Sequence, residues 1–327
     1  MSIPRSFQAL CDLPPKQRTS MGQKLLLRTI REEWPLVAHL RRRMSAAGLD
    51  HSRAIDLDGF RSLTPETLAK SLAQAPRDLC PQPDPGRIRQ NWGWSRKLGL
   101  ILARGKGGPL LQRGYQATLA DPLEDALSGG RNKRVQSSEF DEELLAEQGS
   151  RCLELLGIKA GPLVLDPRAQ FETLTRRALV GGARLQGLEL RESAPPSDQL
   201  QGVHFTTRKA LTAGALNPEG MQQPKLVLLD PINADQQGLL TLTAARLVLP
   251  VLGDGSGAVL WDDLVWVEEV WCEEGGVEQG RGKLAFTHLA QHGTMLARTV
   301  LDLPKAWGRL VPPTDTTPSF PRLTQLD

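Results

Sequence analysis

The spacing of apolar residues predicts helices in the first 75 positions. Over 19–47 apolar side chains recur near every 3.6 residues, which places them on one face of a helix. Pro35 falls inside this run, and proline lacks the N–H that a helix interior needs, so we expect two helices to meet there. Thr64-Pro65 has the capping residue and proline of a helix start, and it predicts a helix running to about Gln74.

The middle of the chain alternates between two patterns. Residues 139–156 and 174–187 have the amphipathic spacing of helices, and Ser137 or Ser138 can cap the first of them. Residues 161–166 and 225–230 are short continuous apolar runs, each ending in Asp. Helices that alternate with such runs are typical of a parallel α/β sheet, because its strands are buried on both faces.

The pattern changes again towards the C-terminus. Apolar and polar residues alternate between Ala258 and Val270, and another strand is predicted over 283–289. Residues 240–303 therefore indicate a β-rich part attached to the α/β core. The Pro, Thr and Asp content after Val311 predicts a loose tail.

Composition adds the class of protein. The 327 residues are 40% hydrophobic and 24% charged, which is typical of a globular chain. The longest apolar stretch, 239–253, is interrupted by Arg246 and Pro250, so we expect no membrane span. The start lacks the pattern of a secretory signal, and the four cysteines form no CxxC pair. These features favour a cytoplasmic protein with reduced thiols.

Charge is distributed unevenly along the chain. Residues 1–134 hold 23 Lys+Arg against 12 Asp+Glu, whereas residues 135–327 hold 17 against 25. The split is expected for a polyanion partner of the first part, for two parts that pack together, or for plain solvated surface. Within residues 87–134, Trp92 and Trp94 are interleaved with basic residues. They either stack bases of a nucleic acid or fill a hydrophobic gap.

Five blocks of sequence resemble a known family in their order and spacing. They are the segment LRRRMSAAGLDHSRAIDLDGFRSLTPETLAKSL (40–72), SGGRNKRV (128–135), the helix, turn and strand at 137–165, GSGAVLWDDLVWVEEV (255–270) and EQGRGKLAFTHLAQHGTMLARTVLDL (278–303). Together they resemble the phenylacetate–coenzyme A ligase branch of the adenylate-forming ligases.

The resemblance implies an α/β fold with an adenylating-enzyme-like core of mixed sheets. That core would cover 120–310, after a helical N-terminal region at 1–75 and a basic connecting segment at 76–119, with 311–327 as the loose tail. It also implies a reaction in which a carboxylic acid and ATP give an acyl-AMP, with Mg²⁺ as the companion of ATP. The family's mobile C-terminal domain, which carries its catalytic Lys, has no counterpart in this sequence.

The resemblance also suggests site residues. Small residues let backbone N–H groups approach phosphate oxygens, and nearby cations add charge. The residues suggested for phosphate are Ser128, Gly129, Gly130, Arg131 and Lys133, and those suggested for ribose are Asp302 and Arg298.

Besides the missing C-terminal domain, a second departure from the family shapes the functional hypothesis. An aromatic-Gly-x-Thr-Glu motif that helps place magnesium is expected upstream of residue 255, but 249–254 reads Leu-Pro-Val-Leu-Gly-Asp. We therefore expect a divergent adenylate-forming protein with weak or lost acid-activating activity that still binds a ligand or partner. One alternative is an active truncated enzyme, helped by a protein that supplies the missing domain. The other is a nucleic-acid-binding protein using 87–134.

Metal binding is not expected elsewhere. His288 and His292 are four residues apart but lack the surroundings of a zinc motif. The acidic cluster of Asp262, Asp263, Glu268 and Glu269 lies in an alternating segment, which points about half of its side chains away from any shared site. No metal ligands are therefore assigned.

Overall fold

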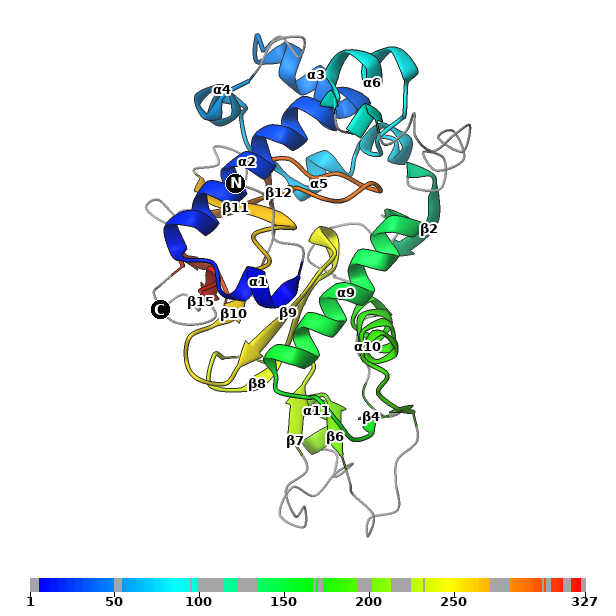
Figure 1. Ribbon diagram of the computed structural model, residues 1–327, viewed down its shortest axis with the longest axis vertical. Helices are drawn as coiled ribbons and strands as arrows, with labels where there is room; N and C mark the ends of the chain where they lie inside the picture. The colour runs from blue at the N-terminus through cyan, green and yellow to red at the C-terminus, as the bar shows by residue number, and fades with distance from the viewer. Residues whose placement is uncertain are drawn as a thin grey trace. The chain divides into compact units, whose positions relative to one another are not determined.

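The computed structural model describes residues 6–49, 55–94, 96–98, 115–122, 134–166, 169, 173–192, 202–212, 225–231, 233–270, 283–301, 303, 307–313 and 319–324 (Figure 1). The chain divides into two compact units. Unit 1 comprises Met1–Glu142, Trp261–Asp302 and Pro313–Phe320, and unit 2 comprises Glu143–Leu260, Leu303–Pro312 and Pro321–Asp327. The segments expected from the sequence (1–75, 76–119, 120–310 and 311–327) are continuous, whereas each unit combines stretches that are far apart in the sequence. The boundaries of those segments stay a prediction.

Unit 1 opens with helices broken at the expected place. They are α1 (Phe7–Cys11), α2 (Pro15–Glu32), the 3-10 helix η1 (Trp34–Leu36) and α3 (Ala38–Ala46). The break at Pro35 is confirmed, and Trp34 and Leu36 beside it are fully buried. Four short helices follow: α4 (Leu57–Ser62), α5 (Leu68–Ser71), η2 (Pro76–Leu79) and α6 (Pro85–Asn91).

The helix predicted from Thr64 begins later than its sequence suggests. Glu66–Thr67 forms strand β1, which pairs in parallel with β13 (Thr299–Val300), and only then does α5 start, capped by Thr67. The Glu66 N–H donates to the Arg298 carbonyl. This long-range hydrogen bond outweighs the local helix-start signal of Thr64-Pro65.

The sheet of unit 1 has four strands in the order β1-β13-β12-β11. Strand β11 (Val265–Val270) pairs antiparallel with β12 (Lys283–His288) over six residue pairs, which confirms the strand predicted at 283–289. A separate antiparallel pair joins β2 (Ala117–Pro122) to β3 (Arg134–Ser138).

Unit 2 is built on a nine-stranded sheet in the order β14-β15-β10-β9-β8-β7-β6-β4-β5. Strands β5, β4, β6, β7 and β8 run parallel, and β8 to β14 pair antiparallel, so the sheet is mixed as the sequence predicted. The parallel strands are β4 (Leu163–Leu165), β5 (Leu190–Arg191), β6 (Val203–Thr206), β7 (Lys225–Leu228) and β8 (Gln237–Leu242). The remainder are β9 (Leu247–Leu252), β10 (Ala258–Val259), β14 (Arg309–Val311) and β15 (Arg322–Thr324).

The helices of the α/β core also match the sequence pattern. They are α9 (Glu139–Leu155), α10 (Thr173–Gln186) and α11 (Arg208–Thr212), with the 3-10 helix η5 (Thr243–Ala245) after β8. Within the described residues, no helix combines the length and apolar character that a membrane crossing requires.

Part of the segment that was expected to be loose forms a strand, β15. Strand β15 lies between β14 and β10, and Leu323 at its centre is fully buried. Its three residues are too few to show a period, and the Pro- and Thr-rich stretch before them hides the signal. The strand forms because two neighbouring strands supply its backbone hydrogen bonds.

Helices α9 and α10 touch through their backbones (Figure 1). A Cβ added at Gly149 would lie 1.8 Å from the Ala178 carbonyl oxygen, and one added at Gly182 would lie 2.3 Å from the Gly149 carbonyl carbon. No side chain fits between the helices at this crossing. Helix periodicity alone does not reveal this constraint, because it concerns the distance to another helix.

Replacing Gly182 with Ala should therefore destabilise unit 2. The added methyl has to push two backbones apart, and such overpacking costs about 1–3 kcal/mol. Urea unfolding measures the loss. Val180→Ala, at a position on α10 that is 41% exposed, serves as the matched control and should change stability by about 0.5 kcal/mol or less. Equal midpoints for the two variants would contradict the close-contact account.

Candidate functional site

The residues predicted to hold phosphate lie outside the described residues, as does Asp302. These are Ser128, Gly129, Gly130, Arg131 and Lys133. The two strands that flank this segment in the sequence are described: β2 pairs with β3, and Pro122 stands opposite Arg134. The predicted phosphate segment is thus the stretch of chain between two paired antiparallel strands.

Arg298, predicted for ribose, is buried in a structural role. Its Nε donates to Glu268 at 2.5 Å, and its Nη1 donates to the carbonyls of Leu63, at 2.6 Å, and Arg61. Only 7% of the residue is exposed. The sequence could not show this, because the partners are 30 and more than 200 residues away. A contact of Arg298 with ribose stays a prediction.

The acidic cluster considered for metal is divided between ion pairs. Glu268 pairs with Arg298, and Asp262 pairs with the fully buried Arg18 at 2.7 Å. Burial raises the pKa of Asp262 to about 7, although the Arg18 charge opposes this shift. Among the described residues, no group of three or more His, Cys, Asp or Glu side chains is arranged to hold a metal ion.

Asp141 organises the base of the β2–β3 hairpin. Its Oδ2 accepts hydrogen bonds from the N–H groups of Ser138 and Gly293, both at 2.7 Å, and its Oδ1 accepts from the His292 N–H at 2.8 Å. The Ser138 hydroxyl in turn accepts from the Asp141 N–H at 3.3 Å. This reciprocal arrangement is a capping box at the start of α9. It confirms Ser138 as a capping residue and ties the loop after β12 to the end of β3.

The loop after β12 passes very close to β3. A Cβ at Gly293 would lie 2.1 Å from the Gln136 carbonyl oxygen, so only glycine fits. Beside it, the Thr294 N–H donates to that carbonyl at 2.9 Å, and the Gln136 N–H donates to the Thr294 hydroxyl at 2.8 Å. The hairpin that flanks the predicted phosphate segment is therefore held from one side by a fixed loop.

Aromatic rings surround His292 at this place. Its imidazole stacks on Tyr115, with ring centres 4.1 Å apart, and on Phe140, at 4.3 Å. The Tyr115 hydroxyl lies 2.9 Å from Glu33 and 2.6 Å from Arg96. Burial raises the pKa of Tyr115, and the Glu33 charge adds to this, so the phenol stays protonated.

A hollow of about 290 Å³ adjoins the His292 ring. It is lined by Arg28, Thr29, Glu32, Glu33, Arg96, Phe140, Leu289, Ala290 and His292.

The two tryptophans of the basic segment differ in their surroundings. Trp92 is 4% exposed and donates its indole N–H to the Glu32 carbonyl at 3.1 Å, so it fills a gap in the core. Arg96 lies over its ring at 3.7 Å. Trp94 is 72% exposed. Trp92 and Arg96 are thus used inside unit 1 and do not form an open stacking surface.

The parallel strands of unit 2 provide a second candidate region. From β4 the chain passes through α10 to β5 on one side, and from β6 it passes through α11 to β7 on the other. Strands β4 and β6 are neighbours, so their carboxyl ends form a topological switch point. Ligands of open α/β sheets bind at such points, because the connections diverge and leave a crevice.

Polar side chains gather at this edge. Asp166, directly after β4, accepts a hydrogen bond from the Thr206 hydroxyl at 2.9 Å, and both residues are buried. Thr207 uses its hydroxyl to cap the start of α11, accepting from Ala210 at 3.3 Å. Asp230, after β7, accepts from the Arg208 N–H at 2.9 Å. Both aspartates are recognisable in the sequence at the ends of predicted strands, although no local motif indicates a role for them.

His204, two residues before Thr206 on β6, is a buried polar residue with a ring nitrogen that lacks a hydrogen-bond partner in the described part of the chain. It is 1% exposed, and among the described residues no group forms a hydrogen bond with its Nε2. Burial lowers its pKa, and the nearby charge of Asp166 opposes the shift. His204 and Thr206 share one face of β6, because strand side chains alternate. A neutral imidazole with a free ring nitrogen is suited to bind a polar ligand atom.

Comparison with known proteins identifies the fold. No protein-family model matches the chain, and no curated protein matches its sequence. Among solved structures, 2-hydroxyisobutyryl-CoA ligase with 2-HIB-AMP in the postadenylation state has a TM-score of 0.67 and 16% identity; the match covers 99% of this chain and 71% of that chain. An open conformation with 2-HIB-AMP and CoA has a TM-score of 0.63 and 16% identity, and the match covers 99% of this chain and 78% of that one.

The chain has the adenylate-forming fold. This confirms the fold class inferred from the sequence, an α/β core with mixed sheets, helical N-terminal region and β-rich C-terminal part. Both of these neighbours are structures of 2-hydroxyisobutyryl-CoA ligase. At 16% identity the likeness shows the fold and leaves the activity to be argued from the site.

Replacing Asp141 with Ala should destabilise unit 1. Three backbone N–H groups would lose a buried charged acceptor, and each such hydrogen bond contributes about 1.5–3 kcal/mol. Partial relaxation makes a total loss of about 3–5 kcal/mol the expected result of chemical unfolding. Glu143→Ala, at an exposed position on the same helix, is the control and should stay close to wild type. A D141A midpoint equal to that of E143A would refute the organising role of Asp141.

His204 and His39 should respond in opposite ways to replacement by Leu. His39 is also buried, but its Nε2 lies 2.8 Å from Glu66, so H39L should cost about 1–3 kcal/mol. H204L removes an unpaired polar atom and should leave stability unchanged or raise it by about 1 kcal/mol. Thermal unfolding of both variants without ligand tests this. A destabilised H204L would show that His204 has a structural partner.

Proposed function

We propose that this chain is a divergent adenylate-forming-ligase-like protein of the phenylacetate–CoA ligase-like branch, with weak or lost acid-activating activity and retained binding of an adenylate-type ligand. The observation that carries the proposal is the likeness of fold over 99% of the chain to a ligase that holds 2-HIB-AMP. The order of the sequence blocks at 128–135, 137–165, 255–270 and 278–303 supports the choice of branch.

The switch-point edge supports ligand binding. Thr206 donates a hydrogen bond to Asp166, and the buried Nε2 of His204 has no hydrogen-bond partner among the described residues. A ligand with a polar atom at this edge would remove the cost of leaving that nitrogen unpaired. The proposed adenylate site is separate from this edge and lies within unit 1, where residues 128–133 hold phosphate through backbone N–H groups and basic side chains. Ribose binding falls mainly to Asp302, because Arg298 already holds Glu268 and two carbonyls.

The proposed loss of activity rests on residues 249–254. Leu249 and Val251 lie on β9 and are fully buried, and the strand carries no carboxylate. The first carboxylate after the strand belongs to Asp254. It accepts one hydrogen bond from the Ser256 N–H, at 2.9 Å, and another from the Ser256 hydroxyl. This stretch therefore offers no aromatic, Thr or Glu where the family places Mg²⁺ beside ATP, and its one carboxylate, Asp254, already accepts from Ser256. Losing one stabilising group typically costs about 3–4 kcal/mol of transition-state stabilisation.

The alternatives have less support. An active truncated enzyme needs charge-stabilising groups that residues 249–254 do not supply. A nucleic-acid-binding protein using 87–134 needs the basic and aromatic side chains free, whereas Arg96 pairs with Glu33 and covers Trp92. A protein partner that supplies or replaces a C-terminal domain stays a prediction.

The proposal predicts binding without turnover. Calorimetric titration with a nonhydrolysable acyl-adenylate analogue should give saturable binding, and Lys133→Ala should weaken it by about 5- to 30-fold, as expected for one charged hydrogen bond. Acid-dependent exchange of labelled pyrophosphate into ATP should be at or near background. Robust exchange by the purified chain would overturn the loss of activity, and failure to bind the analogue would overturn the ligand class.

A further inference from the structure

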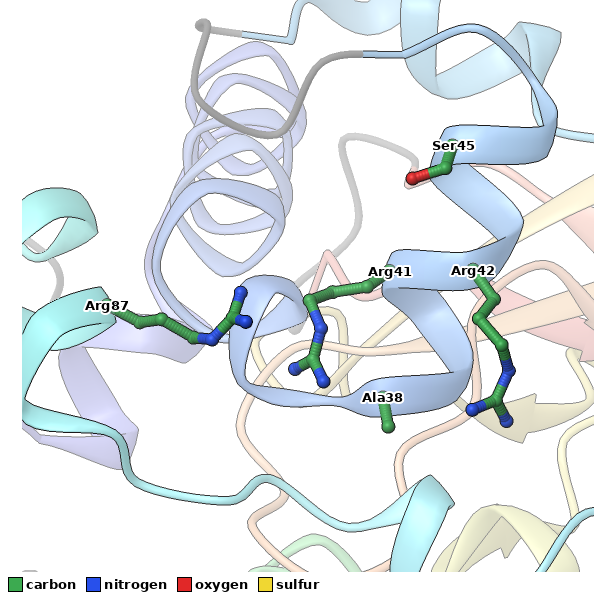
Figure 2. A pocket seen from close by; sticks show the side chains of 5 residues that line it. All are labelled: Ala38, Arg41, Arg42, Ser45 and Arg87. Carbon is green, nitrogen blue, oxygen red and sulfur yellow. The ribbon is translucent and has the colours of Figure 1, made fainter.

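A hollow on unit 1 is lined by arginines from two helices (Figure 2). Its volume is about 420 Å³, and it is bordered by Ala38, Arg41, Arg42 and Ser45 of α3 and by Arg87 of α6. None of these residues belongs to the candidate site described above. The hollow is open to solvent.

The arginines converge on this hollow. In Figure 2 Arg87 extends from α6 toward Arg41 of α3, the guanidinium of Arg41 turns downward beside it, and Arg42 lies on the other side of Ala38. The pKa of Arg41 is lowered by burial first and then by the charges of Arg87 and Arg42. Like charges are therefore held close together, which costs free energy until an anion enters.

Nearby acids leave this charge incompletely balanced. Asp78 pairs with Arg42 at 2.8 Å, and Asp84 uses its carboxylate to cap α6 by accepting from the Arg87 N–H at 2.8 Å. Both acids favour the charged form of Arg41 from a distance. Within the described part of the chain, no carboxylate forms an ion pair with the guanidinium of Arg41 or Arg87.

The side chains on α3 are held in place without a ligand. Arg41 donates to the Pro35 carbonyl at 2.8 Å, and Arg42 donates to Gln74 at 3.2 Å as well as to Asp78. Each guanidinium has five N–H groups, so donors remain for a ligand. Prior ordering lowers the entropy that binding has to overcome.

We propose that this hollow binds the phosphate group of a small phosphorylated ligand. A guanidinium donates two parallel hydrogen bonds to phosphate oxygens, and Arg41 with Arg87 can grip one group from two sides. Arg42 adds charge, and the Ser45 hydroxyl adds a donor or acceptor. Convergence on one hollow favours a compact anion over a nucleic-acid strand, because a strand needs cations spread along a groove.

The test is titration with inorganic pyrophosphate at two salt concentrations. Arg87→Gln should weaken binding by about 10- to 100-fold, the loss of charged hydrogen bonds. Arg89→Gln removes the same charge from an exposed position of α6 that does not line the hollow, and it should stay within about 2-fold of wild type. Arg41→Gln should resemble R87Q, and thermal unfolding confirms that each variant is folded.

Two further titrations distinguish the arginine-lined hollow from the adenylate site and from a nucleic-acid surface. The acyl-adenylate analogue should bind R87Q as it binds wild type. Binding of the analogue and binding of pyrophosphate are therefore measured separately, and either proposal can fail without the other. A single-stranded oligonucleotide should bind weakly. Pyrophosphate binding that is equal in R87Q, R89Q and wild type would overturn the proposal, as would oligonucleotide binding that is tighter than pyrophosphate binding and depends equally on both arginines.

Discussion

The carboxylate of Asp141 is the contact on which the arrangement of unit 1 depends. One buried side chain accepts the N–H groups of Ser138, His292 and Gly293, and so it joins the end of β3, the start of α9 and the loop after β12. Each of these backbone groups would otherwise be buried without a partner, at a cost of about 1–3 kcal/mol. Because Gly293 lies against Gln136, the loop has no room for another position. The hairpin that flanks the predicted phosphate segment is fixed as a consequence.

In unit 2 the corresponding constraint is the contact of α9 with α10. Gly149 and Gly182 bring the two backbones together, and α10 is the connection that leads from β4 to β5. Helix α10 leads from β4 to β5, whereas the connection from β6 leads to β7 on the opposite side. The two connections therefore diverge between β4 and β6, where Asp166 and Thr206 lie. The close packing at Gly149 and Gly182 thus holds α10 in position, and α10 is the connection that leads away from the edge where Asp166 and Thr206 lie. It is also consistent with the burial of His204 beside a carboxylate rather than in contact with solvent.

The sequence predicted those helices and strands that are determined by the spacing of nearby residues. The 3.6-residue spacing identified α2, α3, α9 and α10, and short apolar runs identified β4 and β7. The signals failed where distant residues decide: Glu66 joins a strand because Arg298 accepts its N–H, and Leu323 is buried between two strands that lie elsewhere in the sequence. The candidate site divides in the same way. Asp166 and Asp230 were recognisable at strand ends, whereas the free Nε2 of His204 and the capture of Arg298 by Glu268 depend on tertiary contacts.

What the uneven charge of the chain implies about binding partners also depends on which charged residues pair within the folded structure. The excess of Lys and Arg in residues 1–134 suggested a polyanion partner, but part of it is balanced inside unit 1. Arg18 pairs with Asp262, and Arg96 pairs with Glu33. The first pair joins the basic part of the sequence to the acidic part, as expected for two parts that pack together. What remains after such pairing is informative: Arg41 and Arg87 keep their charge facing a shared hollow. The count of basic residues therefore says little about partners until the internal pairs are removed, and the remainder then marks a specific place where an anion would relieve the repulsion.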